Sequence, residues 1–230
     1  MKRAVGQQVD VLKNRLGGYV ALLVYRFANL CIEANPFALL STQVEVEGET
    51  KKLEEVANVA VHETYHFAVI PIYEDDLFAI GKAIMMEHPE FKQEIKTLDG
   101  FAEEDPAGKI LFYTMPEVDK NRHDLILEAV DAFYDECKMK MSMAQEDCAK
   151  QLAILQANAS PVEIEQVAEY VKKVVDYYDD MRDSNRDTKK QEVEQAYAEY
   201  QAKQKEKEAK EQEKQQAAGN PLQMKLNIEN

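Results

Sequence analysis

The stretch "NVAVHETYHFAVIPIY", residues 58–73, decides the fold, because it can be read as one helix or as two strands. It contains His62, Glu63 and His66 in the H-E-x-x-H spacing of zinc metalloproteases. That spacing holds zinc only on a helix, where both histidines share a face and the glutamate activates the bound water. The stretch is instead rich in Val, Ile, Tyr and Phe, alternates partly with period two and contains Pro71, which predicts two strands joined near residues 63–65.

Two strands deprive the histidines of the fixed geometry that a metal requires. The residues just after the motif are apolar and offer no third ligand. A zinc hydrolase built on His62, Glu63 and His66 is therefore a remote alternative to a structural turn. We expect no metal, no cofactor and no intrinsic turnover, because no other catalytic constellation is visible in the sequence.

The composition limits the partners of this chain. It has 230 residues with 45% apolar content, enough for a packed core, and a formal net charge of -15. Such a charge repels a phosphate backbone, so we expect neither DNA nor a membrane as a partner. The three cysteines form no C-x-x-C pair, and no export signal or membrane-spanning stretch is visible. We expect a cytoplasmic protein, with an organellar matrix as the alternative.

Outside the opening stretch, two segments carry the heptad-like apolar spacing of long helices. The first covers residues 5–33 and is weakened in its middle by Gly17 and Gly18. The second runs from about residue 118 to residue 157. The predicted core positions are Val9, Leu12, Leu16, Tyr19, Leu23 and Leu30 in the first segment, and Ile126, Val130, Phe133, Cys137, Met141, Ala144, Cys148, Leu152 and Leu155 in the second.

A third helix begins at "NASPVEIEQV", with Ser160 as N-cap, Pro161 at the first helical position and Glu163 closing a capping box. None of the three helices can bury its apolar stripe alone, so we expect them to pack as a three-helix bundle. The stripe of the third helix is Val167, Val171, Val174, Tyr178 and Met181.

The block between the first two helices has a different texture. It contains strand-like runs such as "TQVEVEGET", "HFAVIPIY" and "GKILFYTM", and one amphipathic helix, "DLFAIGKAIMMEH". The predicted fold class is therefore α+β, with a small β-rich domain inserted between helix 1 and helix 2 of a long bundle. The predicted domains are the bundle at residues 1–35 and 116–188, the inserted α+β domain at residues 36–115, and a charged extension at residues 189–230.

Each connection between bundle and insertion contains one proline, in "EANPF" and "TMPEV". Few contacts need to cross such paired connections, so we predict a hinge at Asn35, Pro36, Met115 and Pro116. The alternative is a rigid junction in which each proline only ends an element.

The extension from residue 189 is rich in both charges and nearly free of aliphatic side chains until its end. This composition is typical of a solvated helix or a partly disordered tail. Its last residues, "NPLQMKLNIEN", alternate apolar and polar positions, which suggests a strand that docks on a partner or an idle terminus.

The order of elements, and several motifs, resemble those of ribosome recycling factors. The motifs are "VEVEGETKKLEEVANVAV", "HFAVIPIYEDDLFAIGKAIMM" and "PAGKILFYTMPEVDKNRHDL", the last keeping Gly108, Pro116, Arg122 and Leu125. The resemblance covers about four-fifths of the chain. It implies a non-enzymatic, tRNA-shaped translation factor that enters the ribosome after termination and splits the subunits together with a GTP-driven elongation factor. It also implies that arginines, here Arg122, contact ribosomal RNA.

Other positions depart from the family pattern. "CIEANP" has Ile32 and Glu33 where glycine and arginine are expected, and "SMAQED" has Ser142, Gln145 and Glu146 where arginines are expected. Each lost arginine contact costs on the order of 1 kcal/mol, and about 1.4 kcal/mol is a tenfold loss of affinity. Two hypotheses follow: a divergent recycling factor whose partner is the ribosome or a translation factor, or a protein–protein interaction module that retains only the fold.

Overall fold

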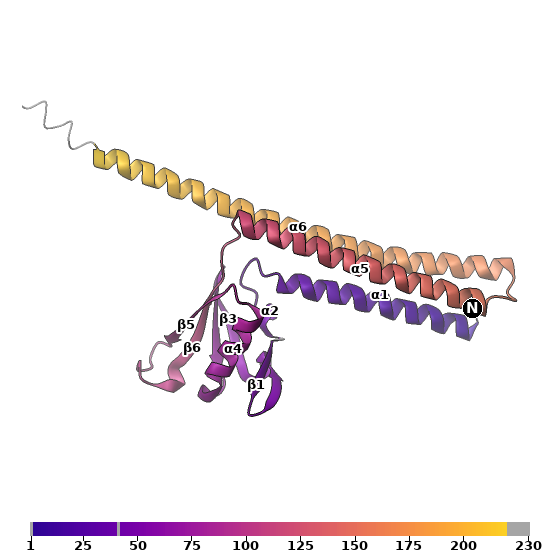
Figure 1. Cartoon of the computed structure of the whole chain (residues 1–230), viewed down its shortest axis with the longest axis horizontal. Coiled ribbons are helices and arrows are strands. Elements are labelled where there is room, and N and C mark those ends of the chain that lie inside the picture. Colours follow the sequence, from indigo (N-terminus) through magenta and orange to yellow (C-terminus); the bar gives the residue numbers. More distant parts are fainter. Residues whose placement is uncertain (1, 41, 220–230) are drawn as a thin grey trace, which may run out of the picture.

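The computed structural model describes residues 2–40 and 42–219 and has an α+β fold. Three long helices, α1 (Arg3–Asn29), α5 (Lys120–Leu155) and α6 (Pro161–Gly219), pack side by side. A smaller domain is inserted between α1 and α5 and projects sideways from the end of α1, while α6 continues past it (Figure 1). This arrangement confirms the predicted fold class. The extension is helical as far as Gly219, and the alternating terminal peptide lies outside the described residues.

The bundle core follows most of the predicted stripe, but on α5 Phe133 is only partly buried and Leu155, at the end of the helix, is 38% exposed. Val20 and Phe27 are buried on α1, whereas Tyr19 and Leu30, which we predicted as core, lie at the edge and are only partly buried. A stripe spaced by threes and fours runs along one face of the helix, and these residues lie just beside it. The buried residues are Val5, Val9, Leu12, Leu16, Val20, Leu23 and Phe27 on α1, and His123, Ile126, Val130, Tyr134, Cys137, Met141, Ala144, Cys148 and Leu152 on α5.

The start of α6 confirms the predicted capping box. The backbone N–H of Glu163 donates to Ser160 Oγ at 3.3 Å, and the Ser160 N–H donates to Glu163 Oε2 at 3.0 Å. Further along α6 the prediction fails at one position, because Met181 is 37% exposed while its neighbour Arg182 is only 7% exposed. Hydrophobicity alone predicts that Met181 is buried, but Arg182 takes the buried position instead. Carboxylates bind its guanidinium group there.

The two glycines in the middle of α1 do not break the helix. A Cβ built on Gly17 would lie 3.3 Å from the hydroxyl oxygen of Tyr178. The absence of a side chain at Gly17 therefore lets the Tyr178 ring of α6 pack closely against α1. Gly18 has no neighbour within 4 Å of the same ideal atom. The weak helix propensity of the pair is therefore overridden by packing across the bundle.

The inserted domain is built on a four-stranded antiparallel sheet with strand order β3-β4-β6-β5. Its strands are β3 (Ala57–Glu63), β4 (His66–Pro71), β5 (Lys92–Thr97) and β6 (Lys109–Thr114). A separate hairpin joins β1 (Gln43–Val46) to β2 (Glu49–Lys52), with positive φ at Glu47 and Gly48 in its turn. Positive φ at both central residues is the conformation of a type I′ turn, which matches the twist of the paired strands.

Short helices complete the inserted domain and cover its core. They are α2 (Pro36–Leu40), α3 (Leu53–Val56), α4 (Leu77–Glu87) and two 3-10 turns, η1 (Glu74–Asp76) and η2 (Pro106–Gly108). Ile80 and Ile84 of α4 share the core with Phe67 of β4 and with Leu111 and Tyr113 of β6. No helix in the described part of the chain is long and apolar enough to cross a membrane.

Candidate functional site

The H-E-x-x-H residues lie on two antiparallel strands, as their period-two surroundings predict. His62 and Glu63 end β3, His66 begins β4, and Glu63 pairs with His66 across the turn. The rings of His62 and His66 lie 5.8 Å and 5.3 Å from the ring of Phe112 on β6. The helical face that a zinc protease needs is therefore missing. Among residues 2–40 and 42–219, no group of three His, Cys, Asp or Glu side chains could hold a metal ion.

The turn between β3 and β4 instead meets both connections to the helical bundle. The N–H of Ala34 donates to the carbonyl of Thr64 at 2.7 Å, and the N–H of Met115 donates to the carbonyl of Tyr65 at 2.8 Å. Both connections between the domains are thus hydrogen-bonded to neighbouring carbonyl groups of the same turn. The residues that first suggested zinc chemistry surround the point where the two domains join.

The predicted hinge residues lie around this turn. Asn35 Oδ1 accepts a hydrogen bond from the N–H of Phe37, and Pro36 begins α2. Met115 is 2% exposed in the core of the inserted domain, and Pro116 follows it between β6 and α5. The backbone bonds of Ala34 and Met115 restrict both connections, and a hinge role for the four residues stays a prediction.

Arg122, the arginine that the resemblance assigns to ribosomal RNA, points into the junction. Its Nη2 donates to the carbonyl of Cys31 at 2.6 Å, which satisfies a backbone acceptor beyond the end of α1. Burial lowers the pKa of the guanidinium, which stays charged at neutral pH. Arg122 thus links the start of α5 to the connection that follows α1. A contact between this residue and RNA stays a prediction.

The remaining arginines of the bundle are mostly paired with carboxylates of the same chain. Arg15 lies 3.0 Å from Asp147, and Arg26 binds Glu136, both across the α1–α5 seam. Hydrogen bonds from Arg26 and Lys140 lower the pKa of Glu136 to about 2. On α6, Arg182 binds Asp179 and Asp183, and Arg186 binds Asp187. Of the six arginines in the sequence, only Arg3 has no side-chain bond among the described residues.

The positions where the family pattern expects arginine on α5 lie on its outer side. Ser142 and Glu146 are exposed, and Gln145 is half-buried. A cation here would face solvent, where it could reach a phosphate group, whereas Glu146 places a negative charge at that surface.

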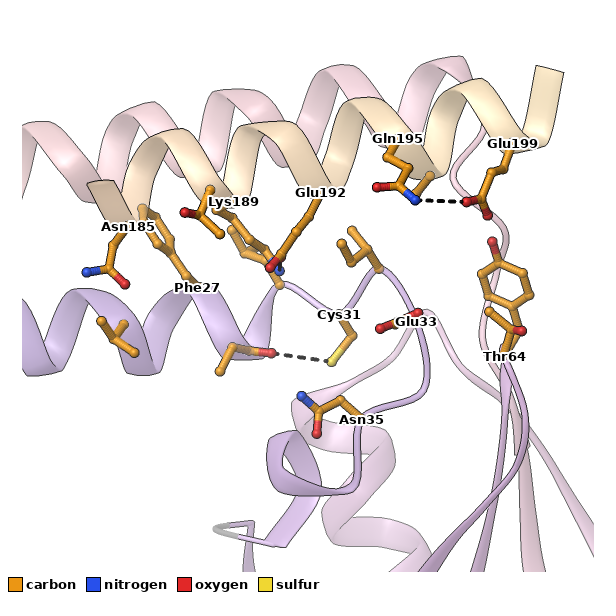
Figure 2. Close-up of a pocket in the computed structure, with 17 residues that line it drawn as sticks. Phe27, Cys31, Glu33, Asn35, Thr64, Asn185, Lys189, Glu192, Gln195 and Glu199 are labelled. Atoms are coloured by element: carbon orange, nitrogen blue, oxygen red, sulfur yellow. Dashed lines mark hydrogen bonds and ion pairs between the residues drawn. The ribbon is translucent and has the colours of Figure 1, made fainter. Parts of the chain in front are cut away.

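A cavity of about 420 Å³ opens beside the junction, between the end of α1, the β3–β4 turn and α6. Figure 2 shows Cys31, Glu33 and Thr64 on one side and Lys189, Glu192, Gln195 and Glu199 of α6 on the other. Lys189 is 8% exposed and lies 3.3 Å from Glu192, and burial raises the pKa of the Cys31 thiol to about 11. The cavity leaves a polar opening where the two domains face one another, so the contact between them is thin.

A family model for ribosome recycling factor matches residues 28–193 of the chain. The chain belongs to the ribosome recycling factor family. No curated protein matches its sequence at a significant level. The match covers most of the chain but leaves out nearly all of α1 and the last part of α6.

Two solved structures share the fold of this recycling-factor family member. A solution structure of the ribosome recycling factor is 15% identical, with a TM-score of 0.69, and the match covers 85% of this chain and 100% of that one. The second is a structure of the T. thermophilus ribosome recycling factor and the E. coli elongation factor G bound to the E. coli post-termination complex. That match is 20% identical, has a TM-score of 0.55 and covers 83% of this chain and 98% of the other. At these identities the likeness is one of fold.

Two features of the junction are not predictable from hydrophobic pattern. Lys203 of α6 lies 3.2 Å from Glu117 and above the ring of Tyr65, although all three residues are far apart in sequence. Lys189 is buried in a segment that reads as solvated helix. The one available signal for such positions is charge spacing, as in Lys189 and Glu192, where opposite charges three residues apart share a helix face.

Proposed function

We propose that this protein is a non-enzymatic translation factor that binds the ribosome after termination and acts there with a translational GTPase. The family match over residues 28–193, on a fold that unites a long bundle with a side domain, carries this proposal. A structural relative at 20% identity is the T. thermophilus factor in a structure with elongation factor G on the post-termination complex. The proposed setting is the cytoplasm or an organellar matrix.

The grip of this protein on ribosomal RNA is proposed to be weaker than in arginine-bearing relatives. Guanidinium groups that already bind Asp147, Glu136 or Asp183 must give up these bonds before they can bind phosphate. The exposed Glu146 adds repulsion on α5. Shape complementarity, hydrogen bonds from backbone groups and lysine contacts would then supply most of the affinity for the ribosome.

The direct test is a subunit-splitting assay. Post-termination ribosomes from the source organism are mixed with the protein, the cognate translational GTPase and GTP, and light scattering follows subunit dissociation. We expect faster dissociation with the full mixture than with the GTPase alone, and no GTP hydrolysis by the protein on its own. As a positive control, the same GTPase must split ribosomes together with an arginine-bearing recycling factor. If that control works and this protein gives no acceleration, a recycling role is contradicted.

A second candidate function is a protein–protein interaction module, favoured by the internally paired arginines and the net charge of -15. An acidic surface on which most guanidinium groups are already paired suits a basic protein better than RNA. The genome offers one discriminating observation: a second, arginine-bearing recycling factor would free this copy for such a role. Affinity capture with crosslinking then separates the two candidates, because a module recovers a defined protein in the absence of ribosomes.

A further inference from the structure

The last part of α6 has no counterpart in the family match, which ends at residue 193. Helix α6 continues to Gly219 without a break. In Figure 1 this part of α6 runs past the connections between the two domains, beyond the end of α1. The family match alone therefore does not say what residues 194–203, the brace segment, do at this place.

The first half of the brace segment is fixed to the start of α5. Glu194 Oε1 lies 3.1 Å from His123 Nε2, and the ring of Tyr197 lies 4.5 Å from the His123 ring. Just before the segment, Lys190 lies 2.5 Å from Asp131 of α5. These contacts hold the helix in one position along α5, so the residues that follow reach the junction at a defined place.

The second half of the brace segment bridges the two domains. Lys203 Nζ lies 3.2 Å from Glu117 Oε1 in the connection between β6 and α5. The same ammonium lies 4.9 Å from the centre of the Tyr65 ring at the tip of the inserted domain. A cation above an aromatic face is attracted to it, so one lysine binds a connection and the inserted domain together.

Few other bonds restrict the angle between the domains. Ala34 and Met115 donate backbone hydrogen bonds to Thr64 and Tyr65, and the cavity of about 420 Å³ leaves the space beside this turn open. A small, polar interface between domains allows them to move by default. The contact of Lys203 with the Tyr65 ring adds a restraint from helix α6 to the backbone hydrogen bonds at this turn, so the turn is held from a third side.

We propose that the brace segment fixes the angle between the inserted domain and the helical bundle through the contacts of Lys203 with Glu117 and Tyr65. This restraint on the interdomain angle is a property of the free protein, so its test does not depend on whether the protein binds the ribosome. The brace holds one angle while its contacts last, and a partner that displaces Lys203 releases the inserted domain.

Distances between two spin labels test the proposal. Thr50→Cys on β2 and Ser142→Cys on α5 place one label on each domain, and both positions are exposed. The native cysteines are 5% exposed or less, so two labels per chain are expected in the folded protein. Double electron–electron resonance then compares the parent with Lys203→Ala. Loss of an exposed ion pair and a cation–aromatic contact should raise the population of other distances roughly three- to tenfold.

Lys210→Ala is the matched control, because Lys210 lies on the same helix and pairs only with Glu206, one turn away. It should leave the distance distribution unchanged. The double variant Lys203→Glu with Glu117→Lys restores the ion pair and should narrow the distribution relative to Lys203→Glu alone. A Lys203→Ala distribution as narrow as that of the parent, or equal broadening by Lys210→Ala, would overturn the proposal. Circular dichroism of each variant verifies that the helices are intact.

Discussion

The buried arginine of α6 offers a sharp test of how the bundle is held together. Arg182 binds Asp179 and Asp183, and its guanidinium lies 5.1 Å from the centre of the Tyr134 ring on α5. Tyr134 in turn donates to Asp183 at 2.8 Å. One buried side chain thus pairs with two carboxylates of α6 and contacts an aromatic ring of α5. Replacement by alanine removes the charge and the packing together.

The cost can be worked out from the burial of each partner. Removing one partner of a fully buried pair costs about 3–5 kcal/mol. The side chains of Asp179 and Asp183 are 34% and 44% exposed, so water can solvate them after the change and the cost is lower. We expect Arg182→Ala to lower the free energy of unfolding by about 2–4 kcal/mol. Arg182→Met keeps the apolar stem, and about half of that loss is expected.

Urea unfolding followed by the helix signal in circular dichroism measures these differences. A loss of about 3 kcal/mol lowers the urea midpoint by about 1 M if the slope is about 3 kcal/mol per M. Lys173→Ala is the control, since its pair with Glu169 is exposed and should contribute less than about 0.5 kcal/mol. If Arg182→Ala costs no more than this control, the buried cluster does not hold α6 to α5.

Three further predictions concern single side chains. Gly18→Ala should raise the melting temperature, since the new methyl group meets nothing within 4 Å and alanine favours helix by about 1 kcal/mol; a lower melting temperature would contradict the open space around it. Burial alone would lower the pKa of His123, but Asp124 and Glu194 raise it above its ordinary value. The stability that His123 adds is therefore full below about pH 6.5 and lost as pH rises through the raised pKa, so urea unfolding should show a smaller deficit of His123→Gln near pH 9 than near pH 6. Glu136 has a pKa of about 2 against an ordinary value of 4.5, so its contribution is present above pH 4.5 and lost toward pH 2. Between pH 4.5 and pH 2, Glu136→Gln should thus lose less stability than the parent. An equal loss of unfolding free energy in both proteins over this range would disprove the pairing with Arg26.

Much of the fold follows from local patterns in the sequence. The stripes of α1 and α5 predict most of the buried positions, because a long helix must bury one continuous face. The Ser160 and Glu163 pair fixes the start of α6, since capping depends on only four consecutive residues. Period-two alternation around His62 and His66 correctly outweighs the zinc motif, because a motif needs its own secondary structure to act.

Side-chain contacts within the bundle and at the junction could not be predicted in the same way. Arg182 reads as surface, and its burial depends on Asp179, Asp183 and Tyr134 meeting in three dimensions. The contacts of Lys203 join residues more than eighty positions apart, and no local pattern records such a pairing. The charged composition after residue 189 left helix and disorder open, because many charges suit a solvated helix and a coil alike.

The most direct test of the central claim is co-sedimentation of the protein with ribosomes from its source organism across a salt series. We predict binding at moderate salt whose logarithmic dependence on salt is shallow, with a slope between about 0 and -2, because few phosphate contacts are made. An arginine-bearing recycling factor in the same series provides the steep reference. Absence of binding at any salt concentration, while the reference factor binds, would contradict the claim that this family member acts on the ribosome.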